Sequence, residues 1–214
     1  MHRYFVTGTD TDVGKTRVTA ALAGALRERA LQPTIAKLVQ TGLNDAQEGD
    51  AARAGRLAGV PHVELARFLR AGDPWSAALA EGQPPVHAED LVRLLAAVEG
   101  ALVAEGAGGL AVPLNRTQNF ADVAKLAGLT CVVVVGLRLG CINHALLTAA
   151  MLEERGIALC GAVLVERWRV EEPQYRADVE RALRDHLPLL GCMAFEVDER
   201  RSIEEGARLF RDLP

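Results

Sequence analysis

The chain has 214 residues, enough for one large domain that buries roughly 70% of the surface exposed by its unfolded form. Half of the residues are apolar and only 4% are aromatic, a composition that suits helices packed closely on a parallel sheet. The formal net charge of −4 gives no overall basic surface for nucleic acid, so we expect small-molecule partners instead.

Cysteine usage indicates a reducing compartment. No Cys-x-x-Cys pair occurs, and most of the cysteines lie within or beside apolar runs. We therefore expect reduced thiols in a cytoplasmic protein rather than disulfides or a zinc site. We find no signal segment before the first predicted strand, and the apolar run at residues 131–137 is too short to cross a membrane. The cysteines are Cys131, Cys141, Cys160 and Cys192.

Apolar runs alternate with helical patterns along the chain, which predicts an α/β fold with a doubly wound, mostly parallel sheet flanked by helices. No linker or internal repeat interrupts the alternation, so we expect a single domain over residues 1–214. The stretch 70–86, with several Gly and Pro residues, is predicted to be a surface loop near the site. Apolar strand-like runs lie at residues 4–7, 34–39, 101–105, 131–137, 159–165 and 190–195. Helices are predicted near residues 16–29, 51–58, 88–98, 120–126, 142–155, 175–186 and 203–211.

The most informative motif is the segment 8–16, which reads Gly-Thr-Asp-Thr-Asp-Val-Gly-Lys-Thr between the first predicted strand and the first predicted helix. In that context the backbone N–H groups of the loop, including those of Val13 and Gly14, can bind phosphate. Lys15 adds a positive charge for the β and γ phosphates, and Thr16 adds a hydroxyl for Mg²⁺. The motif predicts a P-loop, although five residues instead of the usual four precede Gly-Lys-Thr.

Three further charged residues stand at positions where a nucleotide enzyme needs them. Glu105 follows the apolar run 101–104 and is a candidate Mg²⁺ ligand, the alternative being an exposed acid on a turn. Asp50 opens a predicted helix, where it serves either as a second acid at the metal or as an N-cap. Lys37 lies in a strand that should be buried, so it either reaches a charged partner or extends its ammonium group to the surface.

A second loop pattern occurs at residues 136–145, where a strand ends, a glycine turns the chain, and a helix begins. Free N–H groups at a helix start attract a carboxylate, an effect worth about 0.3–1 kcal/mol per charge and up to ~2 kcal/mol when partly buried. We therefore predict a carboxylate cradle formed by Gly140, Cys141, Ile142 and Asn143. The alternative for Cys141 is simple packing in the core.

The segments 8–16 and 136–145 closely resemble those of dethiobiotin synthetases, a branch of the P-loop NTPase superfamily. The resemblance extends over nearly the whole chain and is weak after Val165. It implies an ATP-dependent cyclo-ligase of biotin biosynthesis that converts 7,8-diaminopelargonic acid and CO₂ into dethiobiotin, with release of ADP and phosphate. It further implies Mg²⁺ as cofactor, a homodimer, and no membrane or nucleic-acid partner.

The same resemblance assigns roles around the phosphates. It implies that Lys37 and Lys15 stabilise the negative charge that develops on the carbamate and the γ-phosphate. It also favours the metal interpretation of Asp50, which would join Thr16 and Glu105 around Mg²⁺.

Other assignments by resemblance concern the substrate and the base. Thr11, as a catalytic residue, and Asp12, as a nucleotide-binding residue, could both face the substrate amines, the alternative for Asp12 being a cap of the turn. Thr41 would bind the substrate and stands where the family commonly has serine. The cradle would hold the tail carboxylate across a dimer interface, assisted by Tyr175. Val165 departs from the family, because many members have an asparagine there that reads adenine, and this departure predicts a relaxed nucleotide preference.

Two other classes share parts of this pattern. A ParA-like ATPase switch would be expected to carry a second lysine in its loop and a basic surface, and no lysine lies between Gly8 and Gly14. An amide ligase like cobyrinic acid diamide synthase would need a glutaminase domain with its own cysteine and histidine. A chain of 214 residues leaves no room for such a domain.

Overall fold

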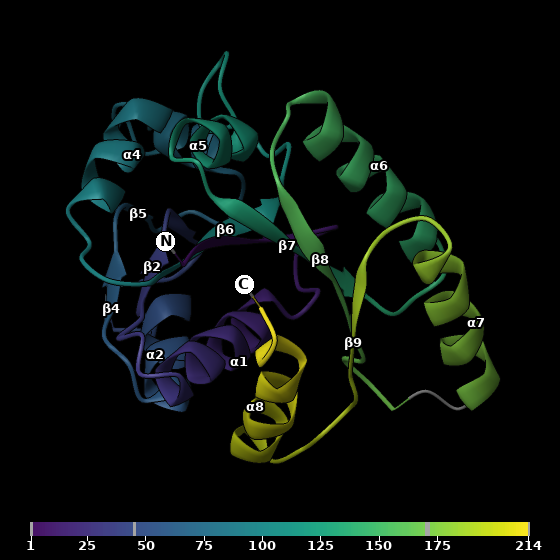
Figure 1. The fold of residues 1–214 in the computed structure, drawn as a ribbon. Helices are drawn as coiled ribbons and strands as arrows, with labels where there is room; N and C mark the ends of the chain where they lie inside the picture. The colour runs from purple at the N-terminus through teal and green to yellow at the C-terminus, as the bar shows by residue number, and fades with distance from the viewer. Residues whose placement is uncertain (1, 45, 170–171, 214) are drawn as a thin grey trace.

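The computed structural model describes residues 2–44, 46–169 and 172–213, and its main feature is a seven-stranded sheet (Figure 1). The spatial order of the strands is β4-β2-β6-β1-β7-β8-β9, and every neighbouring pair is parallel. This arrangement confirms the predicted α/β class. The strands are β1 (Arg3–Gly8), β2 (Thr34–Lys37), β4 (His62–Glu64), β6 (Leu102–Gly109), β7 (Thr130–Gly136), β8 (Leu159–Val165) and β9 (Leu189–Met193).

The central strands are buried on both faces because successive side chains of a strand point to opposite sides. In β1, Phe5 belongs to the core on one face, whereas Tyr4 and Val6 belong to the core on the other. In β7, Val133 packs on the same face as Phe5, and Val132 packs on the opposite face. Continuous apolar runs, rather than alternating ones, were therefore the correct signal for these strands.

Helices cover both faces of the sheet (Figure 1). One face packs against α1, α2 and α8, and the other packs against α4, α5, α6 and α7. Among the described residues, no helix is long and apolar enough to span a bilayer. The helices are α1 (Lys15–Glu28), α2 (Asp50–Ala58), α4 (Ala88–Ala96), α5 (Phe120–Leu126), α6 (Cys141–Glu154), α7 (Pro173–Arg184) and α8 (Glu199–Ala207), followed by a 3₁₀ turn at Arg208–Phe210.

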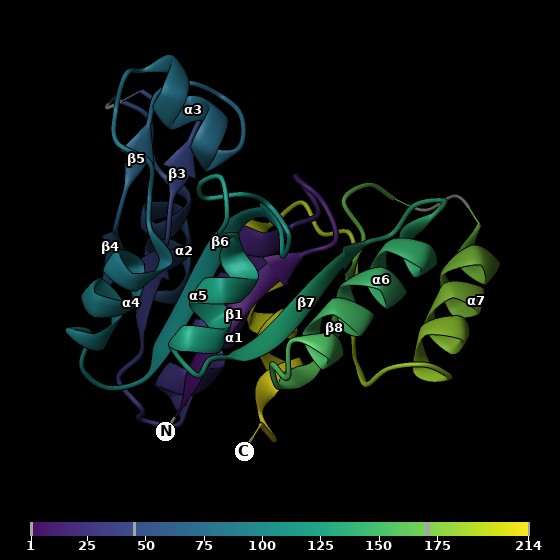
Figure 2. The same cartoon turned by 90° about the horizontal axis from the view of Figure 1, so that it is seen from above.

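The prediction of a loop at residues 70–86 is wrong in its centre, which forms helix α3 (Pro74–Ala80). Asp73 caps this helix by accepting a hydrogen bond from the Ser76 N–H at 2.9 Å, and a proline in the first helical turn loses no helix hydrogen bond. A small sheet of β3 (Gln40–Thr41) and β5 (Arg67–Phe68) packs beside α3. Figure 2 shows this unit standing beyond the main sheet, on the side of β2 and β4.

The strand order places a topological switch point beside β1, where the connections between strands change from one half of the sheet to the other. From β1 the chain first builds the β2 and β4 side, and later builds the β7, β8 and β9 side. In parallel α/β sheets the loops at the carboxyl ends of the strands open into a crevice at such a point. The loop after β1, which is the predicted P-loop, lies there.

Candidate active site

The P-loop leads from β1 directly into α1, as predicted. Gly14 precedes the helix with a φ of 99°, a left-handed conformation that glycine adopts without strain. No side chain in the described part of the chain caps this end of α1, so its first N–H groups are available to an anion. Val13 is buried in the core beneath the loop, and only its backbone can serve a ligand.

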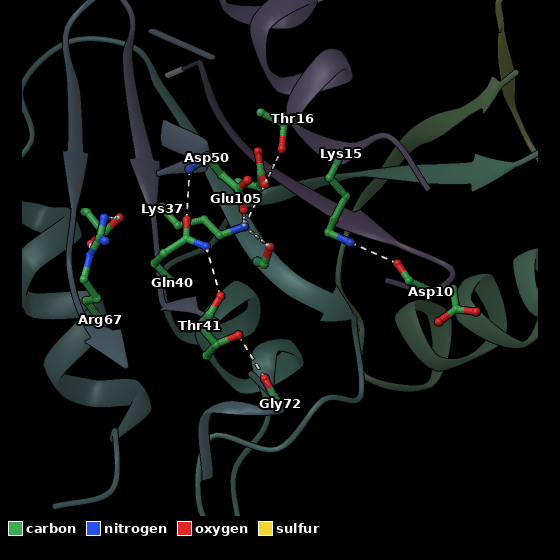
Figure 3. Close-up of polar contacts among 12 residues, drawn as sticks. Asp10, Lys15, Thr16, Lys37, Gln40, Thr41, Asp50, Arg67, Gly72 and Glu105 are labelled. Carbon is green, nitrogen blue, oxygen red and sulfur yellow. Dashed lines mark hydrogen bonds and ion pairs between the residues drawn. The ribbon is translucent and has the colours of Figure 1, made fainter. Parts of the chain in front are cut away.

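Lys15 extends over the P-loop and donates to the main-chain oxygen of Asp10 at 2.9 Å (Figure 3). Burial, together with the positive charge of Lys37, lowers the pKa of the Lys15 ammonium to about 8. Lys15 is therefore mostly charged at neutral pH but poorly compensated in the free protein. An anion bound in the loop would supply the missing partner.

Lys37 and Glu105 are brought together by strand register, because they are paired residues on the neighbouring strands β2 and β6. The Lys37 Nζ lies 2.7 Å from the Glu105 Oε1 and donates to the Gly106 carbonyl at 3.0 Å. Both side chains are almost fully buried, with 2% and 1% of their surface exposed. Lys37 therefore reaches charged partners, and the alternative that it extends its ammonium group to the surface is wrong.

Asp50 completes this ion cluster from the start of α2, with its Oδ2 2.6 Å from the Lys37 Nζ. The N-cap position belongs to Gly49, so the N-cap interpretation of Asp50 is wrong. Burial alone would lower the pKa of Lys37, but the two carboxylates outweigh it and hold that pKa above its ordinary value. Burial would raise the pKa of Asp50, and the Lys37 charge lowers it instead.

Sequence reasoning missed Gln40, which fixes the Asp50 backbone. The Gln40 Oε1 accepts a hydrogen bond from the Asp50 N–H at 2.9 Å, and the side chain is buried (Figure 3). A polar residue next to the apolar strand end was the available signal, but its partner lies ten residues further along the chain. The contact holds the start of α2 against the small sheet.

Thr16 points from the first turn of α1 toward the same carboxylate, with its Oγ1 3.2 Å from the Glu105 Oε1. The second carboxylate oxygen, Oε2, is buried and has no hydrogen-bond partner among the described residues. An unpaired carboxylate oxygen in the interior is costly unless a cation or a proton donor compensates it. Thr16, Glu105 and Asp50, the three predicted metal ligands, thus converge on one region.

These groups open into a cavity of about 730 Å³, a size typical of a small-molecule site. Lys15 and Thr16 of the P-loop line the cavity together with Lys37 and Glu105. Thr41 lines the cavity from β3, and its hydroxyl donates to the Gly72 carbonyl at 2.9 Å, which ties the small sheet to the segment before α3. The prediction that the 70–86 stretch lies near the site is confirmed by this contact.

Thr11 and Asp12 also line the cavity and are exposed. The Asp12 carboxylate forms an ion pair with Arg167, a residue that sequence reasoning did not single out. Asp10 likewise pairs with Arg138. Arginines are common on this chain's surface, so nothing in the sequence distinguished these two from the rest.

The predicted base-reading position, Val165, is fully buried at the end of β8. Its Cγ1 lies 2.8 Å from where a Cβ on Gly14 would stand, so Val165 packs directly beneath the P-loop. Beside it, the Arg17 guanidinium donates to the Glu166 and Ala194 carbonyls. This contact joins the ends of β8 and β9 to α1.

The carboxylate cradle forms the start of α6, with Gly140 at a φ of 87° and no side chain capping the helix. Tyr175 on α7 is close enough for Cys141 to contribute to the raised pKa of its phenol, behind the larger effect of burial. Cys141 itself is buried, whereas Asn143 is exposed. Among the described residues, those of the cradle and Tyr175 do not line the cavity that holds Lys37.

Comparison with known proteins places this geometry in a family. The model of an AAA domain family matches residues 2–198. The ATP-dependent dethiobiotin synthetase BioD of Rhodococcus jostii (strain RHA1) is 39% identical over 188 residues, which span 86% of this chain and 79% of that protein. The same enzyme of Anaeromyxobacter dehalogenans (strain 2CP-C) is 36% identical over 208 residues, 94% of this chain and 93% of the relative. The chain belongs to the dethiobiotin synthetase family.

Solved structures agree on the fold of this dethiobiotin synthetase. The cell division ATPase MinD of Pyrococcus furiosus has a TM-score of 0.61 at 18% identity, covering 100% of this chain and 97% of MinD. A ParA family ATPase of Chlorobium tepidum TLS has a TM-score of 0.57 at 14% identity, covering 98% and 91%. At such low identity the likeness concerns the P-loop NTPase fold alone.

Proposed function

We propose that this dethiobiotin synthetase joins CO₂ to 7,8-diaminopelargonic acid and closes the ureido ring at the expense of ATP. The observation that carries the mechanism is the ion cluster of buried Lys37 and Glu105 with the partly exposed Asp50, at the wall of a cavity shared with the P-loop. A lysine charge fixed beside a phosphate-binding loop can stabilise negatively charged groups that develop during the reaction. These are the carbamate formed on a substrate amine and the transferring γ-phosphoryl group.

The residues present fit a Mg²⁺ ion. Mg²⁺ prefers hard oxygen ligands and keeps several waters, and the Glu105 Oε2 is a buried oxygen without a partner in the described part of the chain. The Thr16 hydroxyl and the Asp50 carboxylate would hold the ion together with Glu105. When bound, Mg²⁺ neutralises charge on the β and γ phosphates.

The reaction needs no nucleophilic side chain from the protein. A substrate amine adds to CO₂ to form a carbamate, and a carbamate oxygen then attacks the γ-phosphorus while the bond to ADP breaks. The second amine attacks the carbonyl carbon of this mixed anhydride, and phosphate leaves as the ring closes. Lys37 and Lys15 stabilise the negative charge on the transferring group, and the P-loop orients the triphosphate.

The carboxylate cradle suggests how the substrate tail is held. Free N–H groups at the start of α6 suit a carboxylate, and Tyr175 lies nearby. In the described part of a single chain, the cradle lies outside the cavity. We therefore propose that it binds the substrate of a second copy's active site in a homodimer. The exposed side chains of Leu139 and Leu147, at 91% and 63%, provide apolar surface for such an interface.

We also propose that the enzyme works in the cytoplasm, since its four cysteines are free thiols.

Phosphate release tests the function directly. We expect release from ATP to require both diaminopelargonic acid and bicarbonate, with dethiobiotin formed in equal amount. Phosphate release that does not depend on these substrates but is stimulated by DNA or a protein partner would favour a ParA-like switch instead.

A further inference from the structure

The P-loop carries two carboxylates in a place where a polyphosphate must bind. Asp10 and Asp12 both lie in the loop, and Lys15 is the only positive residue of the segment 8–16. Taken alone, the loop is therefore net negative. A nucleoside triphosphate is itself strongly negative, so uncompensated acids at this position would oppose its binding.

Each of these acids is paired with an arginine that follows a strand on the β7 and β8 side of the sheet. Arg138 follows β7 and contacts the Asp10 carboxylate. Arg167 follows β8 and donates to both the carboxylate and the main-chain oxygen of Asp12. Segment 8–16 together with these two arginines therefore carries three positive charges and two negative ones.

Arg167 lies at the wall of the cavity and is held in place by its neighbours. It lines the cavity, and its guanidinium lies 5.4 Å from the centroid of the Trp168 ring, within the range of a cation–π contact. Asp12 has a φ of 60°, a left-handed conformation that is uncommon for a residue other than glycine. The bond from Arg167 to the Asp12 main-chain oxygen supports that conformation.

We propose that Arg138 and Arg167 are positioning residues that cancel the acidic charge of the P-loop and thereby allow it to accept a Mg-nucleotide. Arg167 makes the larger contribution, because it is bonded to two oxygens of Asp12 and faces the cavity. The proposal deepens the proposed function only in its nucleotide-binding step. It needs neither diaminopelargonic acid nor CO₂.

The test measures binding of a fluorescent N-methylanthraniloyl derivative of ADP in the presence of Mg²⁺. We expect Arg167→Ala to raise the Kd about tenfold at low salt and Arg138→Ala to raise it less, with the difference shrinking as ionic strength rises. Arg93→Ala is the matched control. Arg93 also pairs with an aspartate, Asp90 at 2.8 Å, but it lies on the fully described helix α4, which contributes no residue to the cavity.

A double variant separates charge cancellation from direct contact. If Arg167 acts by neutralising Asp12, Asp12→Asn combined with Arg167→Ala should regain most of the lost affinity. An Arg167→Ala variant that melts like the wild type and binds equally well would overturn the proposal. So would a double variant that binds no better than Arg167→Ala, because Arg167 would then contact the nucleotide itself. Failure of the wild-type protein to bind the probe would instead contradict the proposed function.

Discussion

Lys37 and Lys15 reach the same cavity but are held in different ways. Lys37 lies between Glu105 and Asp50, whereas among the described residues Lys15 donates only to the main-chain oxygen of Asp10. In the proposed mechanism each lysine would place one positive charge near the transferring phosphoryl group. We expect Lys37→Ala and Lys15→Ala each to lower kcat at least about 100-fold in steady-state assays. Activity of Lys37→Ala within a few-fold of the wild type would remove Lys37 from the mechanism.

The two lysine variants should differ in stability. Lys37→Ala leaves Glu105 and Asp50 as neighbouring carboxylates without their shared cation, and losing one partner of a buried pair typically costs about 3–5 kcal/mol. Lys15→Ala removes an ammonium group whose pKa is already lowered by burial. The free energy of unfolding of this variant should therefore differ much less from that of the wild type. Urea unfolding of the metal-free proteins measures both. Equal losses in the two variants would contradict this difference.

Glu105 is expected to determine metal affinity. Glu105→Gln keeps the size of the side chain but removes the charge on its unpaired oxygen, so apparent Mg²⁺ affinity should fall by roughly tenfold or more. The measurement is the Mg²⁺ concentration that gives half-maximal activity at saturating ATP. Glu89→Gln, a carboxylate on α4 that accepts hydrogen bonds from Gln118, is a control in which that concentration should not move. An unchanged value in Glu105→Gln would contradict the metal assignment.

Val165 offers a base neither a donor nor an acceptor. Losing one specific hydrogen bond to the base forfeits roughly 1–3 kcal/mol of discrimination. We therefore expect CTP or GTP to support turnover with a kcat/KM within about a hundredfold of that for ATP. The backbone after β9 is a competing reader of the base, but the Phe195 N–H already donates to the Glu166 carboxylate at 3.1 Å. Kinetics with the four triphosphates will show whether ATP is preferred beyond that margin.

At the level of elements, α3 shows where sequence reasoning is weakest. Glycines and prolines around residues 70–86 indicated a loop, yet Asp73 and the following Pro74 are also the residues that start a helix. Six strands of the main sheet were easier to predict, because each contains apolar residues in succession, whereas the edge strand β4, which reads His-Val-Glu, lacks such a run and was not predicted. Short strands such as β3 and β5 have only two residues each and carry no periodic signal.

The stability of α3 should depend on its cap. Asp73→Ala removes the bond to the Ser76 N–H and should cost about 1 kcal/mol of local stability, seen as faster amide hydrogen exchange over residues 74–80. Asp73→Asn keeps a capping oxygen and should exchange nearly as slowly as the wild type. If alanine and asparagine behave alike, the cap is not what holds α3.

The site divides into a part that sequence could predict and a part that it could not. The P-loop was predicted from its motif, and Lys37 and Glu105 from their positions in or after apolar strands. Asp50 was placed at the metal by the family resemblance. Gln40 and Arg167 were missed because their roles depend on partners distant in sequence, and only the fold brings the pairs together. Register, in particular, made Lys37 and Glu105 direct neighbours across two strands.

At the scale of the whole molecule, the separation of the cradle from the cavity argues for assembly. If the start of α6 serves a second copy, the enzyme should be a homodimer and its monomer should be inactive. Sedimentation combined with activity assays at several concentrations tests this. Leu147→Glu, on the exposed face of α6, should shift the equilibrium toward monomer and lower activity in parallel. A fully active monomer at assay concentration would contradict the dimer proposal.

The contact between Gly14 and Val165 restricts which residue can stand at the turn of the P-loop. A Cβ on Gly14 would lie 2.8 Å from the Val165 Cγ1, so any other residue at position 14 would have to displace the end of β8. Position 14 also has a φ of 99°, which residues other than glycine adopt only with strain. An engineered variant with a side chain at position 14 would need a smaller residue at position 165 and would still carry this strain, so glycine is expected to be indispensable at this turn.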